Sequence, residues 1–273
     1  MQTGTDALLS VSVVTYQPEP ETFAALLRSL AQALKAVQDH LSGACEVTVV
    51  DHSPDPQPVR RISGMEEAPP LRLVHDPRNP GFGAGHNRVI DATRAPYHLI
   101  LNPDVELPEM TLVELLRYLQ AQPEVVALGP EVRDGEGHVQ SSCKGEVTVL
   151  DLALRGFAPN WLRRRFAKRL ARYECQEMMK AKRIAPALHL SGCFMLCRTE
   201  ALRAVGGFDE GYFLYFEDFA LSRALQSRGR VLYFPAVHIV HHGGYAARKG
   251  LTHLRYFGKS AWRWFQTQGW KLW

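Results

Sequence analysis

The sequence predicts an α/β protein in which helices cover both faces of a mostly parallel sheet. Its first hundred residues alternate short apolar runs with longer segments that carry apolar residues at helical spacing. Turn residues interrupt the runs where strands would end, as Asn102-Pro103-Asp104 does after Leu99–Leu101. In such proteins the carboxyl ends of the strands meet at one edge of the sheet, where ligands bind.

The predicted elements of the first half follow from this alternation. Apolar, Val-rich runs predict strands at 8–16, 46–51, 71–74 and 99–101. A helix is expected over 21–41, and another from the Gly-rich stretch 79–87 to about residue 93. A strand–helix–strand order implies a parallel sheet with right-handed crossovers.

The second half of the chain has a different pattern. It predicts helices at 111–120 and 200–205 and after Glu217-Asp218, a basic helical segment at 152–183, and strands at 125–129, 191–197, 230–234 and 237–242. We therefore divide the chain into a first half at 1–110, a second half at 111–246 and an amphipathic tail at 247–273.

Composition limits the class of protein. The chain has 273 residues, 46% of them hydrophobic, a net charge of +4 and five cysteines. The small net charge does not demand a nucleic-acid partner, and an odd cysteine count without paired spacing suits a reducing compartment. The first residues lack the cationic start of a signal peptide, and no run is long enough to span a bilayer. We expect a cytoplasmic protein, peripheral to the inner face of the cell membrane.

Two acidic positions indicate chemistry. Asp104 follows a strand, and hard cations such as Mg²⁺ are commonly held there by one or two carboxylates together with substrate phosphates. Glu217 and Asp218 fall in the first turn of a helix, whose dipole favours the ionised carboxylate. The alternatives are structural: Asp104 as a turn former, and the acidic pair as a helix cap.

Eight short motifs occur in one order along the chain. They are Val11–Tyr16, Val49–Asp51, Asn79–Asn87, Leu101–Asp104, Ser191–Leu196, Gly206–Glu210, Tyr215–Asp218 and His241–Gly244. Over residues 9 to 246 this ordered set resembles the family-2 glycosyltransferases, in particular the rhamnosyltransferase-like branch. The resemblance implies the GT-A fold, a nucleotide-sugar donor, inversion at the anomeric carbon, and Mg²⁺ or Mn²⁺ as cofactor.

The resemblance also implies roles for single residues. Asp218 is expected to be the general base, with Glu217 beside it, and Asp104 the metal ligand, joined by His241. The residues expected to bind the nucleotide-sugar are Thr15, Tyr16, Asp51, Asn79, Gly83, Asn87 and Asn102. Asn102 stands at the first position of the family's Asp-X-Asp-like motif, as in the rhamnosyltransferase-like members, whereas Ala220 and Ala246 depart from the pattern of the relatives. The resemblance also makes 1–110 the nucleotide-sugar-binding half and 111–246 the acceptor-binding and catalytic half of one domain.

Each of these expectations has an alternative. Strand alternation puts His241 on the face of Val237 and Ile239, and His242 on the opposite face; either histidine fits the metal, and His241 is favoured by its spacing to the glycines. The glycines of 81–85 also suit a tight backbone turn, and their order is not a dinucleotide fingerprint. The spacing of His189, Cys193 and Cys197 fits a metal site, but their apolar surroundings favour core packing.

Two segments combine aromatic and basic residues. The tail 251–273 holds Trp262, Trp264, Trp270 and Trp273 among cations, and 152–183 mixes apolar residues with clustered Arg and Lys. Such amphipathic segments bind anionic membrane surfaces. For the tail we favour membrane contact; for 152–183 a solvated helix face packed on the domain is an equal alternative.

The function expected from these features is the transfer of a sugar, with rhamnose from dTDP-rhamnose as the donor that the resemblance implies. The acceptor is expected to be a lipid-linked saccharide or polysaccharide in cell-surface glycan synthesis, and no nucleic-acid partner is expected. The alternatives are a UDP-hexose donor on the same fold, and a non-catalytic nucleotide- or nucleic-acid-binding module. The sequence leaves open the acceptor, the linkage and the oligomeric state.

Overall fold

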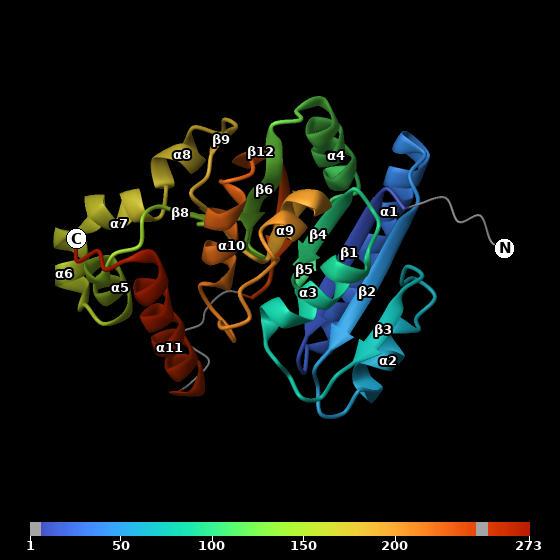
Figure 1. Cartoon of the computed structure of the whole chain (residues 1–273), viewed down its shortest axis with the longest axis horizontal. Coiled ribbons are helices and arrows are strands. Elements are labelled where there is room, and N and C mark those ends of the chain that lie inside the picture. Colours follow the sequence, from blue (N-terminus) through green and yellow to red (C-terminus); the bar gives the residue numbers. More distant parts are fainter. Residues whose placement is uncertain (1–6, 244–250) are drawn as a thin grey trace.

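The computed structural model of the chain describes residues 7–243 and 251–273 (Figure 1). Its strands are β1 (Leu9–Thr15), β2 (Cys45–Asp51), β3 (Arg72–His75), β4 (Tyr97–Leu101), β5 (Val105–Glu106), β6 (Val125–Arg133), β7 (Val139–Gln140), β8 (Cys143–Lys144), β9 (Ala185–Pro186), β10 (His189–Leu190), β11 (Phe194–Arg198) and β12 (Arg230–His241). Its helices are α1 (Pro20–Leu41), α2 (Gln57–Ser63), α3 (Phe82–Ala92), α4 (Thr111–Ala121), α5 (Val149–Gly156), α6 (Asn160–Arg165), α7 (Ala167–Tyr173), α8 (Gln176–Lys180), α9 (Thr199–Ala204), α10 (Glu217–Leu225) and α11 (Leu251–Gln268).

One mixed sheet runs through both halves of the described chain. Its main path has the order β3-β2-β1-β4-β11-β6-β12-β5, and β7 and β9 pair with β6 and β12. The pairs β3-β2, β2-β1 and β1-β4 are parallel, as the alternating sequence predicted, whereas β11 is antiparallel to both β4 and β6. The carboxyl ends of β1, β2, β4, β6 and β12 therefore lie at the same edge, together with the start of β11.

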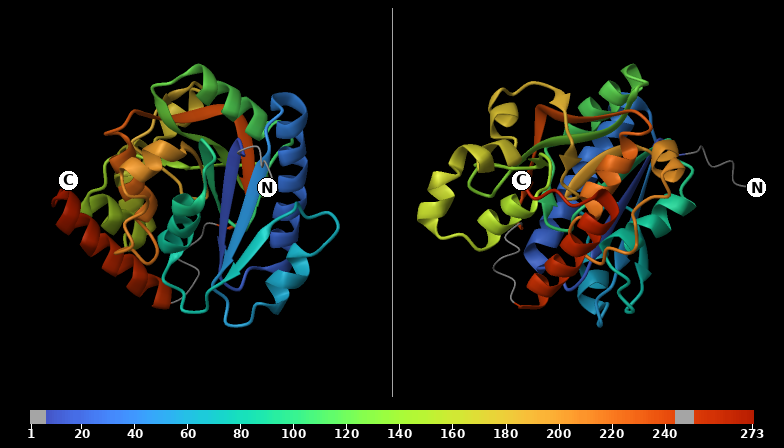
Figure 2. Two further views of the ribbon diagram at one scale, coloured as in Figure 1. Left: turned by 45° about the vertical axis from the view of Figure 1, so that its right-hand side comes forward. Right: turned by 60° about the vertical axis from the view of Figure 1, so that its left-hand side comes forward.

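Helices cover both faces of the sheet, which confirms the predicted fold class (Figures 1 and 2). On one face α1, α2 and α4 bury apolar side chains such as Leu27, Val59 and Leu116 against the strands. On the other face α3, α9 and α10 contribute Ile90, Leu202 and Leu221 to a second apolar cluster. Burial of these side chains stabilises the layers, at about 1.5–3 kcal/mol for each large aliphatic residue.

A smaller third core joins the C-terminal helix to the rest of the protein. Trp264 and Phe265 of α11 are only 1% and 4% exposed, and they pack with Phe216. The hydroxyl of Ser260 donates to the carbonyl oxygen of Leu214 at 2.8 Å, and Arg263 lies 2.8 Å from Asp209. The helix of the expected tail is therefore part of the fold, and it holds the segment that precedes Glu217.

The basic segment predicted at 152–183 is helical over most of its length, but it is not continuous. It forms the four short helices α5 to α8. Pro159 has no N–H to continue a helix beyond α5, and Cys175 has a left-handed φ of 51° between α7 and α8. Two strands expected at 230–242 instead form the single strand β12, with a register shift between Phe234 and His238. No helix among the described residues is long and apolar enough to cross a membrane.

A buried polar network crosses the sheet between β1, β4 and α3. The hydroxyl of Ser12 lies 2.6 Å from His86 Nδ1 and 2.8 Å from His98 Nε2, and all three residues are fully buried. Burial lowers the pKa of His98 to about 3, and it lowers that of His86 well below its usual value. Both imidazoles are therefore neutral in the folded protein at neutral pH.

This network predicts a loss of stability in mild acid. The unfolded chain takes up protons on these histidines near pH 6.5 and the folded chain does not, so the free energy of unfolding falls as the pH drops from 6.5 toward 3. The slope approaches about 1.4 kcal/mol per pH unit for each histidine. The raised pKa of Glu217 acts with the opposite sign, because there the folded protein binds the extra proton.

The contribution of His98 can be isolated by difference. We expect His98→Gln to reduce the slope of unfolding free energy between pH 6.5 and 5 by about 1 kcal/mol per unit, measured by urea denaturation. The exposed His40, replaced as His40→Gln, is the matched control for loss of an imidazole outside the core. Equal slopes in wild type and His98→Gln would contradict the prediction.

Candidate active site

The candidate residues gather at the carboxyl edge of the sheet. Thr15 ends β1, Asp51 ends β2, and the two are paired in register. Asn102 and Asp104 follow β4, and His241 ends β12. The parallel order of the strands thus brings together polar residues that are far apart in the sequence.

Asp104 and His241 face each other at this edge. The Nε2 atom of His241 lies 3.3 Å from Oδ1 of Asp104 and 3.4 Å from Nδ2 of Asn102. The backbone N–H of His242 donates to the carbonyl oxygen of Asp104 at 3.0 Å, which fixes the two segments relative to each other. A side chain at Gly243 would collide with the Asp104 carboxylate, because its Cβ would lie 2.0 Å from Oδ2.

The structure separates the two histidines of the motif. Val237, Ile239 and His241 are buried on one face of β12, as strand alternation predicted, whereas His242 is exposed. The Nε2 atom of His242 lies 2.5 Å from Oε1 of Glu106, away from Asp104. His241 is therefore the histidine that shares a site with Asp104, and its role as a metal ligand stays a prediction.

The donor set at Asp104 and His241 fits a divalent cation held partly by its substrate. A carboxylate oxygen and an imidazole nitrogen 3.3 Å apart can bind one ion, and carboxylates suit Mg²⁺ and Mn²⁺. No cluster of three or more His, Cys, Asp or Glu side chains suited to a metal occurs in the described ranges. A cation here would therefore take further ligands from water and from the phosphates of a donor.

The acidic pair lies at the start of α10. Both carboxylate oxygens of Asp218 accept backbone hydrogen bonds, from the N–H of Gly192 and from its neighbour Phe219, each at 2.9 Å. Glu217 is buried, and its Oε2 has no hydrogen-bond partner among the described residues. Tyr215 and Phe216, just before the pair, have φ of 73° and 66°. Bulky residues rarely adopt such a backbone conformation, and strained residues of this kind cluster at functional sites.

The surroundings change the basicity of both carboxyls. Removal from water raises the pKa of Asp218, and the two backbone N–H groups partly offset this. The pKa of Glu217 is raised well above its usual value by burial and by the charge of Asp218. Of the two, Asp218 is the carboxyl whose negative charge is stabilised by hydrogen bonds, so it carries the charge that a proton acceptor needs.

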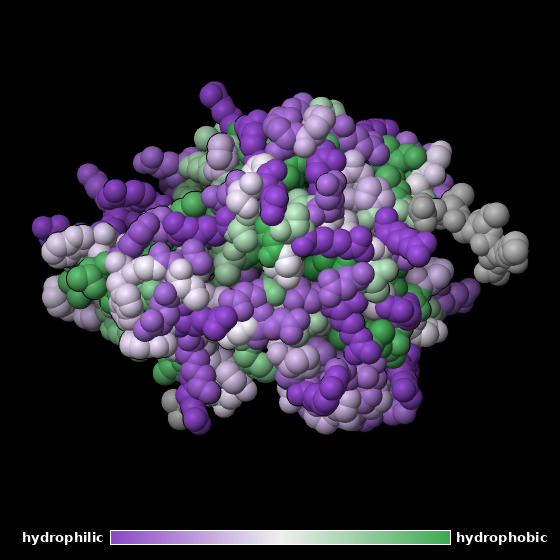
Figure 3. Space-filling view, viewed as in Figure 1, coloured by the Kyte–Doolittle hydropathy of each residue, from purple (hydrophilic) through white to green (hydrophobic). Residues whose placement is uncertain are grey.

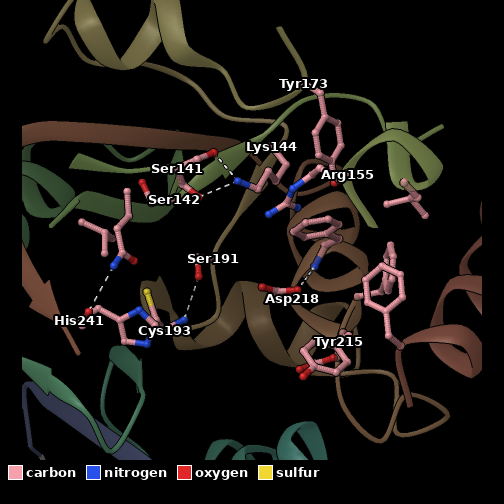
Figure 4. A pocket seen from close by; sticks show the side chains of 17 residues that line it. Ser141, Ser142, Lys144, Arg155, Tyr173, Ser191, Cys193, Tyr215, Asp218 and His241 are labelled. Atoms are coloured by element: carbon pink, nitrogen blue, oxygen red, sulfur yellow. Dashed lines mark hydrogen bonds between the residues drawn. The ribbon is translucent and has the colours of Figure 1, made fainter. Parts of the chain in front are cut away.

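A cavity of about 290 Å³ connects these groups (Figure 4). Asp218, Glu217 and His241 line it, with Ser191 and Cys193 between them. Its other wall is formed by residues of 130–190 and by aromatic side chains: Val132, Gln140, Ser141, Ser142, Lys144, Leu152, Arg155, Tyr173, Tyr215, Phe216, Phe219 and Phe257. The cavity thus brings the acidic pair and the metal-binding candidate into one site.

Two predicted nucleotide contacts carry unsatisfied polar atoms. Thr15 Oγ1 and Asp51 Oδ2 are buried, and neither has a hydrogen-bond partner among the described residues. The other carboxylate oxygen of Asp51 accepts from the N–H of Ser53 at 2.9 Å. Buried polar atoms are nearly always satisfied in folded proteins, so unsatisfied ones at a ligand-binding edge suit a bound partner. Tyr16, the next residue, is exposed.

The residues of the Gly-rich stretch have contacts within the protein. Asn79 adopts a left-handed φ of 48° just before Pro80. A Cβ at Gly83 would lie 2.7 Å from Phe208, so this glycine allows α3 to approach the 206–210 loop. The amide of Asn87 donates to Phe208 O and Glu210, and accepts from Phe208 N–H at 2.8 Å. Gly83 and Asn87 therefore fix this loop, and a contact with the donor stays a prediction.

The cavity contains cations that the sequence did not single out. Lys144 of β8 and Arg155 of α5 line it; Lys144 lies outside every interpreted pattern, and Arg155 begins the basic segment 152–183, for which no role in the site was predicted. One signal was present: Ser141-Ser142-Cys143-Lys144 is a short polar run with a cation, outside every matched motif. His189, Cys193 and Cys197, whose spacing also fits a metal site, are buried in the core, as predicted, and Cys193 also lines the cavity.

Comparison with known proteins decides the family. A family model described as "Glycosyltransferase like family 2" matches residues 7–267. The chain belongs to this family. The N-acetylglucosaminyl-diphospho-decaprenol L-rhamnosyltransferase of Mycobacterium tuberculosis is 30% identical over 268 residues, which is 93% of this chain and 82% of the relative. The rhamnosyltransferase WbbL of Escherichia coli K12 is 26% identical over 67% of this chain and 66% of its own length.

Solved structures share the fold of this glycosyltransferase. The mannosyltransferase PcManGT of Pyrobaculum calidifontis, in complex with GDP-Man and Mn²⁺, superposes with a TM-score of 0.59 at 21% identity, over 94% of this chain and 65% of that chain. GalNAc-T7 with UDP, GalNAc and Mn²⁺ gives a TM-score of 0.59 at 13% identity, over 88% of this chain and 45% of that chain. The predicted GT-A fold is confirmed.

Proposed function

We propose that this glycosyltransferase moves rhamnose from dTDP-rhamnose, with inversion, onto a lipid-linked saccharide of a cell-surface glycan, using Mg²⁺ or Mn²⁺. The observation that carries the proposal is one cavity lined by His241, the partner of Asp104, at one side and Asp218 at the other. The names of the two rhamnosyltransferase relatives support the choice of sugar, and the first name also supports a lipid diphosphate acceptor.

The proposed reaction is a single displacement. The acceptor oxygen forms a bond to the anomeric carbon while the bond from that carbon to the donor phosphate breaks, and the electron pair leaves with dTDP. The acceptor hydroxyl gives its proton to the carboxylate of Asp218, which the N–H groups of Gly192 and Phe219 hold in place. Its raised pKa makes Asp218 a stronger base than an exposed aspartate.

Asp104 and His241 are proposed to hold the divalent cation. When bound, the cation supplies positive charge that stabilises the leaving diphosphate. Asn102, whose amide lies beside His241, is proposed to contact the donor, and Thr15, Tyr16, Asp51 and Asn79 to surround its nucleoside. Burial of the unsatisfied atoms of Thr15 and Asp51 supports this arrangement, because a base with donor groups would satisfy them.

A panel of donors tests the function. We expect dTDP with Mg²⁺ to raise the melting temperature more than UDP or GDP does, and dTDP-rhamnose to support metal-dependent release of nucleotide. Preference for a UDP-hexose would replace the donor but keep the reaction. Stabilisation by nucleotides with no turnover of any donor, in the presence of a lipid-linked acceptor, would indicate a binding module and overturn the proposal.

We also propose that α5, α6 and the C-terminal residues form a surface that binds an anionic membrane. The residues after α11 run beside the start of α5, since the N–H of Val149 donates to Lys271 O at 2.9 Å. Phe157, Trp161 and Trp273 at this end of the molecule are 74%, 70% and 85% exposed. The exposed arginines Arg163–Arg165 follow Trp161, and Figure 3 shows apolar among hydrophilic residues there.

Removal of the exposed aromatic residues should weaken membrane binding. We expect the triple variant Phe157→Ser, Trp161→Ser, Trp273→Ser to bind vesicles of phosphatidylglycerol and phosphatidylcholine at least about tenfold more weakly, because aromatic burial drives such binding. Val139→Ser, at an exposed residue on β7, is the matched control. Co-sedimentation measures both, and unchanged binding of the triple variant would exclude this surface. Truncation of the tail is unsuitable because Trp264 is core.

A further inference from the structure

The cavity has a cationic end that neither the metal nor the base of the proposed reaction explains. Lys144 and Arg155 lie there with Tyr173, and Figure 4 shows them on the side away from His241. The guanidinium carbon of Arg155 lies 5.9 Å from the centre of the Tyr173 ring. Lys144 Nζ donates to the carbonyl oxygen of Ser141 at 2.8 Å and also to its hydroxyl. These contacts hold both cations at the cavity wall.

The positive charge at this end is only partly compensated. Arg155 Nε lies 3.5 Å from Glu174 Oε1, the one ion pair that either cation forms with the described residues. Burial and the charge of Arg155 lower the pKa of Lys144 to about 8. Lys144 lies within electrostatic reach of Asp218 but forms no ion pair with a described residue, and a desolvated positive charge is costly without a close counter-charge. An anion bound here would supply it.

A hydroxyl lies next to the cations. Ser142 is buried, lines the cavity, and its Oγ has no nitrogen or oxygen partner within hydrogen-bond distance among the described residues. A phosphate has several strong acceptor oxygens, and Lys, Arg and hydroxyl groups all donate hydrogen bonds to such oxygens. The three side chains thus offer the donors that a phosphate group requires.

The place of Asp218 indicates which substrate would bring the phosphate. In an inverting displacement the base acts on the acceptor, on the face of the sugar opposite the leaving diphosphate. Figure 4 places His241, the neighbour of Asp104, at one corner of the cavity, Asp218 at a second, and Lys144 with Arg155 at a third, so the two cations lie apart from the proposed metal site.

We propose that Lys144, Arg155 and Ser142 bind a phosphate group of the acceptor, so that the acceptor is a saccharide joined to its carrier through phosphate or diphosphate. This inference rests on the proposed function, because it takes Asp218 as the base that faces the acceptor. It adds residues that select the acceptor by its charge, close to the hydroxyl that reacts.

Direct binding tests the site without need of turnover. The probes are N-acetylglucosamine joined by a diphosphate to farnesol, the neutral farnesyl glycoside of the same sugar, inorganic pyrophosphate, and dTDP with Mg²⁺. We expect wild type to bind the diphosphate probe at least about tenfold more tightly than the neutral one in calorimetry, with pyrophosphate competing. Lys144→Gln and Arg155→Gln should each remove most of this difference and leave dTDP binding within twofold.

Controls separate the possible outcomes. Lys180→Gln removes an exposed cation outside the cavity and should change none of these affinities, and circular dichroism checks that each variant is folded. Equal affinity of wild type for both farnesyl probes would overturn the inference. So would loss of dTDP affinity in Lys144→Gln, since that would assign the cations to the donor. If dTDP-rhamnose supported no turnover but the wild-type protein still bound the diphosphate probe more tightly than the neutral probe, only the proposed donor would be overturned.

Discussion

Asp218→Asn is expected to reduce transfer by about 10²–10⁴-fold while donor binding stays nearly intact. The amide keeps the shape of the carboxylate but cannot take the proton of the acceptor hydroxyl. Because both oxygens of Asp218 accept backbone N–H groups, the amide nitrogen leaves Gly192 or Phe219 without an acceptor. That loss costs about 1–3 kcal/mol of stability, which a folded glycosyltransferase domain can tolerate. Single-turnover kinetics at saturating donor and acceptor measure the effect.

Glu217→Gln is the matched control for the base. The neighbouring acid is more deeply buried and its pKa is raised well above the usual value by burial and by Asp218, so it is a poorer carrier of negative charge. We expect its amide variant to retain more activity than Asp218→Asn. The reverse order would assign the base to Glu217, and wild-type rates in both variants would leave the pair only a structural role at the start of α10. Melting temperatures recorded for both exclude unfolding as the cause.

Asp104→Ala is expected to lower kcat/KM by about 10²–10³-fold and to remove the dependence of dTDP binding on Mg²⁺ or Mn²⁺. Asp104 is the one carboxylate beside His241 at this edge of the described structure, so its loss leaves the imidazole and Asn102 as the remaining neighbours. The fold should persist, because the contact of Asp104 with His242 is made by its backbone carbonyl. Calorimetry of dTDP with and without the cation measures the effect.

Glu106→Ala is the matched control for Asp104. It removes a carboxylate two residues away, one that pairs with the exposed His242. Metal-dependent binding of dTDP should be the same as in wild type. If Asp104→Ala retained metal-dependent binding and Glu106→Ala lost it, the cation would belong to the pair Glu106 and His242, and the proposed position of the donor diphosphate would move to that side of β12.

Much of the fold follows from local sequence patterns. The Val-rich strand β1 and the helix α1 with Leu27 and Leu30 are read directly from apolar periodicity, because burial on one face selects one period. The edge where Asp51 and Asp104 lie follows from the parallel order of these elements. The position of Glu217 and Asp218 in the first turn of a helix was also predicted from the local sequence.

Other features depend on contacts between distant segments. The pattern of 152–183 predicted a basic helical segment, but not that Pro159 and packing on the third core divide it into short helices. The amphipathic C-terminal segment looked like a separate tail, whereas Trp264 fills a core beside Phe216. Burial by a partner segment cannot be read from either sequence alone, because the same amphipathic pattern suits a protein core and a membrane surface.

By itself, the sequence determined the layered α/β fold, the family, and the position of Asp104 and Asp218 at the ends of their elements. Only the tertiary structure decided that His241 and not His242 faces Asp104, and that Lys144 and Arg155 share a cavity with Asp218. The physical reason is that hydrophobic periodicity and turn chemistry report only on residues that are close together in the chain. A site assembled from β8, α5, α10 and β12 depends on how the layers pack.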